Sequence, residues 1–459
     1  MKLTQLIENL FKKYLPSPFT IAILLTLFTL FLALVFTKPE QETAITYTLN
    51  VFNFWEKGIW SDGLLVFAYQ MMLILVLGHV LVLSKPISNL ILKVTQYCNN
   101  TAVSAAIVSC TTMLVAFFNW GLGLIFGALL ARKVAEHARK NGISLNYPII
   151  GAAGYTGVMV WHGGISGSAP IKINESGHIK SIMKSISSEE VLGKIPEVIN
   201  YSQTVFSWWN LLIFMAVVVG VTVTFYRIGK KATPTSINLP EYQMNIQETA
   251  TTQAEKLDSS KMLAYFFGSL ILIAFLYRYF EEIISLKITP NLINFFMLGL
   301  GIILHGSFKK FTNAVGDSIS DVSGILIQFP LYFGIMGIMK STGMVTLISD
   351  FFVSISTTAT LPVFTFLSAG LVNIFVPSGG GQWVVQGPIV VESALQLGVP
   401  LPKAIMAMAY GDQITNMLQP FWALPLLGIT KLKAKEILPY TLIAMFVGSV
   451  IYLVGLLIF

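Results

Sequence analysis

The clearest candidate for chemistry is Asp412, the one acidic residue well inside a long apolar stretch, 402–430. An ionised carboxylate is costly in an apolar medium, so an acid in this position is a functional-site hypothesis by default. Its carboxyl group can take up a proton or ligate a sodium ion. The alternative interpretation is a neutral, hydrogen-bonded Asp with a structural role.

Two asparagines stand in similar settings. Asn119 precedes Gly121 in a Gly-rich break, and Asn373 lies shortly before Pro377. A side-chain amide both donates and accepts hydrogen bonds, and unwound backbone offers carbonyl oxygens to a cation. We therefore predict that Asn119, Gly121 and Asn373 bind a coupling ion together with Asp412. Helix C-capping by the asparagines is a compatible alternative.

Two clusters of Ser and Gly follow breaks in apolar stretches, and such turns let the backbone approach and cradle an anion. A tight turn or close helix packing without a ligand is the alternative. Four Trp residues lie near the breaks, where they line a pocket for a short apolar tail or serve as interfacial and packing residues. They are Trp120, Trp161, Trp383 and Trp422. The residues that we predict to bind an anionic substrate are Ser166, Gly167, Ser168, Ser378, Gly379, Gly380 and Trp383.

The composition places these residues in a membrane protein. Of 459 residues, 54% are hydrophobic and 11% charged, whereas soluble domains carry about 25% charged residues. The net charge of +7 does not indicate a nucleic-acid partner, because Lys and Arg flank the apolar runs. The partner that we expect is the lipid bilayer. Uninterrupted runs long enough to span it lie at about 17–36, 62–84, 206–228, 259–280, 289–306, 321–340 and 436–459.

The interrupted stretches predict an all-α polytopic protein built from inverted repeats, each with a re-entrant hairpin and a discontinuous transmembrane helix. Features recur in the same order in both halves, with about nine full spans plus two hairpins in all. Shared apolar composition of unrelated helices is the alternative. The predicted parts are a first repeat 1–228 (hairpin about 101–134, broken helix about 145–174), a polar cytoplasmic linker 229–258, and a second, inverted repeat 259–459 (hairpin about 360–398, broken helix about 402–430). We expect the last broken helix to be interrupted at Gly411-Asp412-Gln413 and again at Gln419-Pro420.

Most of the 29 Lys and Arg residues fall on one side of the predicted topology if the N-terminus is cytoplasmic. The first run, 17–36, is not followed by a small-residue cleavage site, so we interpret it as a retained anchor.

No catalytic or cofactor motif is present. The sequence has no His/Cys/Asp/Glu cluster with metal-ligand spacing, no catalytic triad motif and no Walker loop. We therefore expect no enzyme activity, no metal and no cofactor beyond H⁺ or Na⁺ as coupling ion. His162, beside the first break, is either a pH-responsive group or a hydrogen-bonding spacer.

With these motifs in place, the sequence resembles the bacterial short-chain fatty acid transporter family of the AtoE type, within the larger ion transporter group. The resemblance covers nearly the whole chain, with 37–58, 172–203 and 229–258 least alike. It rests on Asn119–Gly123, Gly163–Ser168, Val376–Pro388, Ala409–Gln413 and Gln419–Pro425. Two positions depart from the family pattern: His162 stands where Gly is usual, and Asp412 where Glu is usual.

The resemblance implies uptake of short monocarboxylates such as acetoacetate or butyrate across the bacterial inner membrane, with elevator-like motion. Our hypothesis from the residues is cation-coupled symport, because a bound H⁺ or Na⁺ removes the repulsion between an ionised Asp412 and an anionic substrate. The alternatives are a dicarboxylate or other organic-anion carrier, a cation/proton antiporter, or a passive channel. A homodimer is expected by analogy alone.

Overall fold

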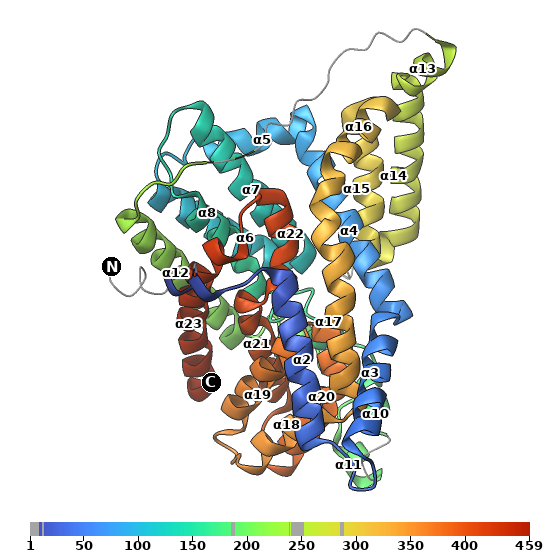
Figure 1. Ribbon diagram of the computed structural model, residues 1–459, viewed down its shortest axis with the longest axis vertical. Coiled ribbons are helices and arrows are strands. Elements are labelled where there is room, and N and C mark those ends of the chain that lie inside the picture. The colour runs from blue at the N-terminus through green and yellow to red at the C-terminus, as the bar shows by residue number, and fades with distance from the viewer. Residues whose placement is uncertain (1–8, 12, 185–188, 238, 240–251, 285–288) are drawn as a thin grey trace.

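The structure is a computed structural model that describes residues 9–11, 13–184, 189–237, 239, 252–284 and 289–459 (Figure 1). Every regular element in this part of the chain is a helix. Seven of these helices are long and apolar enough to cross a membrane, so the prediction of an all-α polytopic membrane protein is confirmed. They are α2 (Pro18–Phe36), α4 (Asp62–Leu83), α6 (Thr101–Phe118), α12 (Trp208–Lys231), α14 (Lys261–Ile284), α17 (Ser323–Ser341) and α23 (Ala434–Ile458).

The remaining elements complete the fold. The short apolar helices are α15 (Pro290–His305), α18 (Met344–Ser354), α19 (Leu361–Phe375) and α22 (Pro420–Thr430). The others are α3 (Ala44–Ile59), α5 (Lys85–Thr95), α7 (Trp120–Lys140), α8 (Tyr147–Gly154), α9 (Ser168–Ile173), α10 (His178–Met183), α11 (Glu189–Lys194), α13 (Gln253–Asp258), α16 (Phe308–Ser318), α20 (Gly379–Gln396), α21 (Leu401–Thr415) and the 3-10 turns η1 (Thr156–Met159), η2 (Tyr201–Gln203), η3 (Ile319–Val322) and η4 (Asn416–Leu418).

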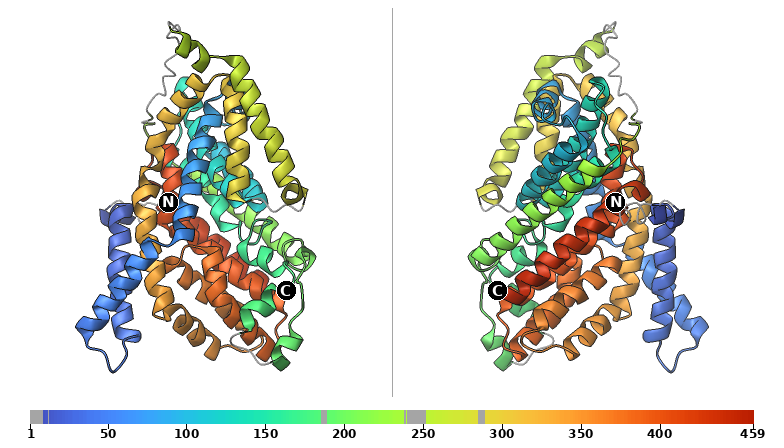
Figure 2. Two further views of the ribbon diagram at one scale, coloured as in Figure 1. Left: turned by 90° about the vertical axis from the view of Figure 1, so that its right-hand side faces the viewer. Right: turned by 90° about the vertical axis from the view of Figure 1, so that its left-hand side faces the viewer.

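The helices pack as two groups, and each group draws on both halves of the chain. In the first, α2 and α3 pack against α17, and α4 packs against α15, which in turn packs against α14. In the second, α6, α7 and α8 pack together, α19 packs against α21, and α12 lies beside α23 (Figure 2). The elements from α4 to α12 and from α17 to α23 follow a similar order, except that α10, α11 and η2 have no counterpart in the second stretch. The inverted repeats, their boundaries and the re-entrant hairpins stay predictions.

The structure shows one helix that the apolar runs did not predict. Helix α3 runs from Ala44 to Ile59, between the runs at 17–36 and 62–84. Its Gly58 packs directly on the backbone of α17, where a Cβ would lie 3.0 Å from the Cα atoms of Gly334 and Gly337. The apolar residues of α3 are spaced for one face only, so the segment has no continuous apolar run by which the sequence could identify it.

The structure also corrects the break at Gly411-Asp412-Gln413. Helix α21 continues to Thr415, and the interruption comes at η4 and Gln419. Gly411 serves packing instead, because a Cβ there would overlap the carbonyl oxygen of Phe366 and lie 2.9 Å from the Ala369 Cβ. Helices α19 and α21 thus approach too closely for any side chain at this point.

We expect Gly411→Ala to force α19 away from α21, at a cost of about 1–3 kcal/mol for overpacking. The melting temperature of the purified protein in detergent should fall by several degrees. Gly316→Ala is the matched control, because nothing lies within 4 Å of a Cβ at that position. An unchanged melting temperature for Gly411→Ala would refute the close packing.

Candidate functional site

Two helices that begin in mid-chain breaks define the site. Asn119 and Ser378 both have extended backbone with φ −151°, and each caps the helix that follows. Asn119 Oδ1 accepts from Leu122 N at 3.0 Å, and Ser378 Oγ accepts from Gly381 N at 3.1 Å. These caps provide an acceptor for some of the backbone N–H groups that are unpaired at the start of a helix.

The segment between η1 and α9 is irregular and tightly packed. Ile165 N donates to the carbonyl oxygen of Phe117 at 2.8 Å, at the end of α6. A Cβ on Gly164 would overlap that carbonyl group, and one on Gly167 would overlap the carbonyl oxygen of His162. Ser166 Oγ accepts from Trp120 N at 2.9 Å, so this segment also caps α7.

The start of α20 lies against the same segment. A Cβ on Gly379 would lie 2.7 Å from the Trp161 ring and 2.8 Å from His162 Cε1, while one on Gly380 would lie 3.8 Å from Ser168 Oγ. The breaks of both halves therefore meet. Within the described residues, the N–H groups of Gly379 and Gly380 have no hydrogen-bond acceptor, and they give this place a partial positive charge.

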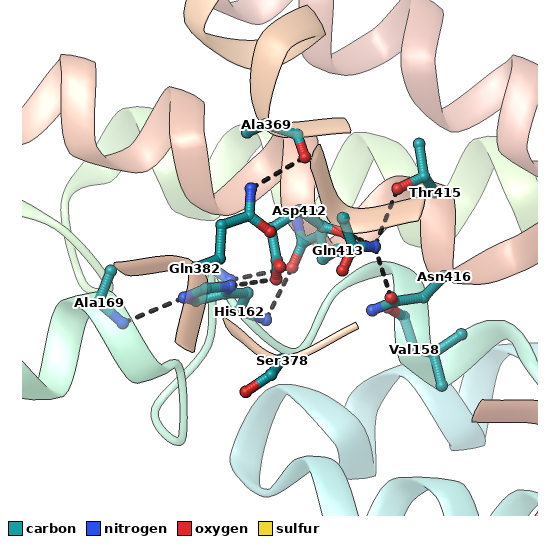
Figure 3. Close-up of polar contacts among 12 residues, drawn as sticks. Val158, His162, Ala169, Ala369, Ser378, Gln382, Asp412, Gln413, Thr415 and Asn416 are labelled. Atoms are coloured by element: carbon teal, nitrogen blue, oxygen red, sulfur yellow. Dashed lines mark hydrogen bonds and ion pairs between the residues drawn. The ribbon is translucent and has the colours of Figure 1, made fainter. Parts of the chain in front are cut away.

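His162 and Asp412 form a buried pair at this meeting point (Figure 3). His162 Nδ1 lies 2.5 Å from Asp412 Oδ2, and the backbone N–H of Ala169 donates to His162 Nε2 at 3.0 Å. Asp412 Oδ1 is buried and has no hydrogen-bond partner in the described structure. An unpartnered buried carboxylate oxygen is unusual, because such groups are costly to desolvate.

Gln413 holds the backbone of the irregular segment. Its Oε1 accepts from His162 N at 2.7 Å and from Gly163 N at 3.0 Å, and its Nε2 donates to Tyr452 OH at 2.8 Å. Tyr452 OH donates in turn to the carbonyl oxygen of Met159 at 2.9 Å. One buried side chain thus links α21, α23 and the first break.

Asn373 makes the corresponding link inside the second half. Its Nδ2 lies 2.7 Å from the carbonyl oxygen of Asp412, 2.9 Å from Thr415 Oγ1 and 2.8 Å from Asn416 Oδ1, and its own carbonyl oxygen accepts from Gln419 Nε2. The amide therefore fixes the end of α21 to α19.

Three of the four predicted Trp residues lie together. The ring centroids of Trp120 and Trp422 are 5.4 Å apart and those of Trp120 and Trp161 are 6.1 Å apart, with Phe67 at 6.1 Å from Trp120. The Trp161 ring stacks on the His162 imidazole at 4.5 Å. Together Phe67, Trp120, Trp161 and Trp422 form an aromatic cluster beside the His162–Asp412 pair.

Trp383 lies elsewhere. It is buried in a separate core cluster, and its Nε1 donates to His178 Nε2 at 3.1 Å. This contact ties α20 to α10 in the segment that precedes α12. Burial lowers the pKa of His178, and the positive charge of Lys172 lowers it further, while Glu175 acts in the opposite direction.

A pH effect on stability follows from this contact. Protonated His178 cannot accept from Trp383, and its pKa is depressed in the folded protein, so its contribution is complete above the unfolded pKa of about 6.5 and is lost as pH falls below it. We expect the melting temperature to drop between pH 7.5 and pH 5.5, and to drop less in His178→Gln and in Trp383→Phe. Equal pH dependence in all three proteins would contradict this role.

Most of the predicted site residues therefore come together. Ser166, Gly167, Ser168, Gly379 and Gly380 line the junction of the breaks, and Asn119 and Ser378 cap the helices that start there. Gly121 is the second residue of α7, with 3.5 Å between its would-be Cβ and Asn119 Oδ1. Asp412 lies in the last turn of α21, and Asn373 lies near the end of α19, in contact with the Asp412 carbonyl oxygen. Their roles in binding stay predictions.

Sequence reasoning missed the partnerships of His162, Gln413 and Gln382. Gln382 Nε2 donates to the Ala369 carbonyl oxygen at 2.9 Å and to Gln386 Oε1 at 2.8 Å. A signal was available, since each of these polar side chains stands in an apolar stretch.

Buried cationic side chains do not serve this site. Among the buried residues of the described structure, Arg132 is the single Lys or Arg. Its guanidinium group pairs with Glu136 at 2.9 Å and donates to the carbonyl oxygen of Ile429 at 2.6 Å. An anion at the junction would therefore be held by N–H and O–H dipoles.

Solved structures give weak likenesses to this chain. MtrF of Neisseria gonorrhoeae, described among antimetabolite efflux pumps, shares 14% identity and a TM-score of 0.39, covering 98% of this chain and 97% of its own. The YdaH transporter of Alcanivorax borkumensis gives the same identity and TM-score, with 96% and 98% covered. A TM-score of 0.39 is too low to carry a conclusion about this chain.

Sequence relatives give a clear assignment. A protein of Escherichia coli (strain K12) provisionally named a short-chain fatty acid transporter is 36% identical over 473 residues, covering 100% of this chain and 99% of the relative. A protein of Haemophilus influenzae with the same provisional name is 34% identical over 463 residues, covering 99% of each. The short chain fatty acid transporter family matches residues 1–459. The chain therefore belongs to the short-chain fatty acid transporter family.

Proposed function

We propose that the protein is a secondary active transporter that carries short monocarboxylates, such as acetoacetate or butyrate, by cation-coupled symport. The observation that carries this proposal is the buried Asp412 carboxyl group with one unpartnered oxygen, at the junction of the two breaks. A site for a coupling ion and a site for an anion thus lie side by side.

The substrate carboxylate fits the start of α20. There Gly379 and Gly380 have N–H groups without an acceptor in the described structure, a Cβ on Gly380 would lie 3.8 Å from Ser168 Oγ, and Ser378 Oγ caps the same turn. Helix starts of this kind bind anions without a charged side chain. This is one anion-binding site, and no buried Lys or Arg of the described structure lies beside it. These features favour a substrate with one carboxylate group over a dicarboxylate.

The aromatic cluster supplies an apolar neighbour for a short tail. Trp161 touches Gly379 on one side and the cluster on the other. An alkyl chain of a few carbons gains about 0.8 kcal/mol for each CH₂ that it buries. Trp383 has no part in this surface, because it lies in the separate core cluster with His178.

The coupling between ion binding and substrate binding follows from their charges. A buried carboxylate and a buried substrate anion repel each other strongly, and one bound H⁺ or Na⁺ at Asp412 removes this repulsion. Each ligand then raises the affinity for the other by the same factor.

The same proposal includes an arrangement in the membrane. The helix group built from α6–α8, α12 and α19–α23 carries the site and moves, while the group built from α2–α4, α14, α15 and α17 stays fixed. We further propose the bacterial inner membrane as location, a cytoplasmic N-terminus and a homodimer formed through the fixed group.

The test is uptake of radiolabelled butyrate into proteoliposomes, with pH and Na⁺ gradients imposed separately. Protein-free liposomes give the background, because the acid form of butyrate crosses lipid unaided. We expect saturable, protein-dependent accumulation driven by one of the two gradients. Uptake that only equilibrates would indicate a channel or facilitator, and competition by succinate but not by acetoacetate would indicate a dicarboxylate carrier.

A further inference from the structure

A pocket of about 240 Å³ lies where three helices of the second group have their ends together. It is lined by the first turns of α12 and α21, the last turns of α23 and the 3-10 turn η2. Figure 2 shows α12 and α23 side by side as far as the end of the chain marked C. Both helices are long and apolar enough to span a membrane, so a pocket at their ends lies at the level of the lipid headgroups.

This pocket, called the Lys403 pocket below, carries unpaired N–H donors. Lys403, Gln203 and Trp209 line it. The Lys403 ammonium group and the Trp209 Nε1–H group have no acceptor among the described residues, and neither has the Gln203 amide nitrogen. No Asp or Glu side chain in the described part of the chain lines the pocket. One full positive charge and two further donors are the complement of an anionic group.

The rest of the lining is apolar. Pro402 of α21 and Leu456 and Phe459 of α23 form part of this wall. Gly455 lets α12 and α23 approach each other here, because a Cβ on it would lie 2.5 Å from Ile213 Cδ1. The pocket therefore offers a surface to hydrocarbon beside the positive charge.

Beyond the pocket, both spanning helices carry exposed apolar side chains at spacings of three and four residues, which place each set on one face of its helix. They are Leu212, Met215 and Val219 on α12, and Val450, Val454 and Leu457 on α23, each between 45% and 64% exposed. The exposed Trp208 ring lies 5.0 Å from the ring of Phe459, as is typical of the aromatic belt at a membrane interface. A ligand that reaches from the pocket along these faces has a polar head and long apolar chains.

We propose that the Lys403 pocket binds the phosphate group of an anionic phospholipid, whose acyl chains lie along α12 and α23. The positive charge of Lys403 favours phosphatidylglycerol, which has a net negative charge, over phosphatidylcholine, whose headgroup carries its own cation. A short soluble carboxylate would use the charge of the pocket but not the apolar faces of the two helices. The proposal concerns a lipid ligand and does not depend on the proposed transport of butyrate.

The pocket adjoins residues that hold the first break. Asn210 follows Trp209 on α12, and its amide nitrogen donates to the carbonyl oxygen of Gly163 at 3.0 Å. Its amide oxygen accepts from the hydroxyl group of Tyr410 on α21 at 2.5 Å. A headgroup that contacts both Lys403 and Trp209 therefore joins α12 to α21 close to the place where these helices fix the break. A ligand that binds only the folded state raises its stability.

The experiment measures the melting temperature of the delipidated full-length protein in detergent, with increasing amounts of dioleoylphosphatidylglycerol or dioleoylphosphatidylcholine. Native mass spectrometry of the same samples counts the bound lipids. We expect phosphatidylglycerol to raise the melting temperature of the wild-type protein by several degrees and to remain bound as at least one molecule per chain. Phosphatidylcholine at the same concentration should have little effect.

Variants of Lys403 locate the response. Lys403→Gln should fold normally and need about fivefold more phosphatidylglycerol for half of the shift in melting temperature. Lys403→Arg keeps the charge and should respond as the wild-type protein does. Lys57→Gln is the matched control, because Lys57 is exposed in the last turn of α3 in the other helix group.

The outcomes decide between lipid and soluble anion. An equal response to phosphatidylglycerol in the wild-type protein and in Lys403→Gln would overturn the proposal, as would an equal response to phosphatidylcholine. Butyrate and inorganic phosphate are titrated in the same way. If either one stabilises the wild-type protein but not Lys403→Gln, and phosphatidylglycerol has no effect, the pocket binds a soluble anion and the lipid proposal is wrong.

Discussion

Replacing Asp412 with Asn should give a folded protein that exchanges butyrate but no longer accumulates it. Asn has nearly the same shape as a protonated Asp, can still accept from His162, and carries no charge. With one ion per substrate, a tenfold ion gradient supports about tenfold accumulation. We expect the wild-type protein to approach this ratio and Asp412→Asn to remain at the equilibrium ratio of about one.

A second measurement and a control variant make the result decisive. Counterflow of labelled against unlabelled butyrate should persist in Asp412→Asn, which shows that the substrate still binds. Asp350→Asn is the control, because that acid lies exposed on α18 and should support wild-type accumulation. Full gradient-driven accumulation by Asp412→Asn would rule out a coupling role for this residue.

Replacing Gln413 with Leu should destabilise the protein and disrupt the site together. The change leaves the buried N–H groups of His162 and Gly163 without their acceptor, and Tyr452 without its donor. An unpaired buried polar group costs about 1–3 kcal/mol. Release of His162 N also frees the imidazole ring that holds Asp412. We expect a strongly reduced melting temperature and loss of measurable butyrate uptake.

Gln396→Leu is the matched control for this change. Gln396 is exposed on the last turn of α20, where its amide contacts Glu392 at 3.3 Å. Melting temperature and uptake should match the wild-type protein. If Gln413→Leu melts within a degree of the wild-type protein, the Gln413 network does not hold the first break in place.

The pattern of apolar residues was enough to place the long helices. The runs predicted at 62–84 and 289–306 correspond to α4 at Asp62–Leu83 and α15 at Pro290–His305. A helix in lipid must be apolar on most faces and of a minimum length, so its sequence identifies it without reference to neighbours. Helix α3 was missed because its polar face lacks this signal.

Gly residues were harder to interpret. Gly411 was expected to break α21, yet it lies inside a continuous helix and lets α19 approach. The sequence alone does not distinguish a Gly inside a continuous helix from a Gly at a helix break. The carbonyl group of Phe366, which decides between the two, belongs to another helix.

The sequence by itself determined that this is a multi-span helical membrane protein of the short-chain fatty acid transporter family, with an acid and small-residue breaks inside its apolar stretches. Only the tertiary structure decided what these residues do to one another. His162 and Asp412 are separated by 250 residues along the chain. Neither their residue types nor their spacing predicts that two such distant residues form a pair. Their hydrogen bond exists because α20 and α21 pack against the segment that follows η1. That packing turns an isolated acid into one member of a buried pair, with one carboxylate oxygen left without a partner in the described structure.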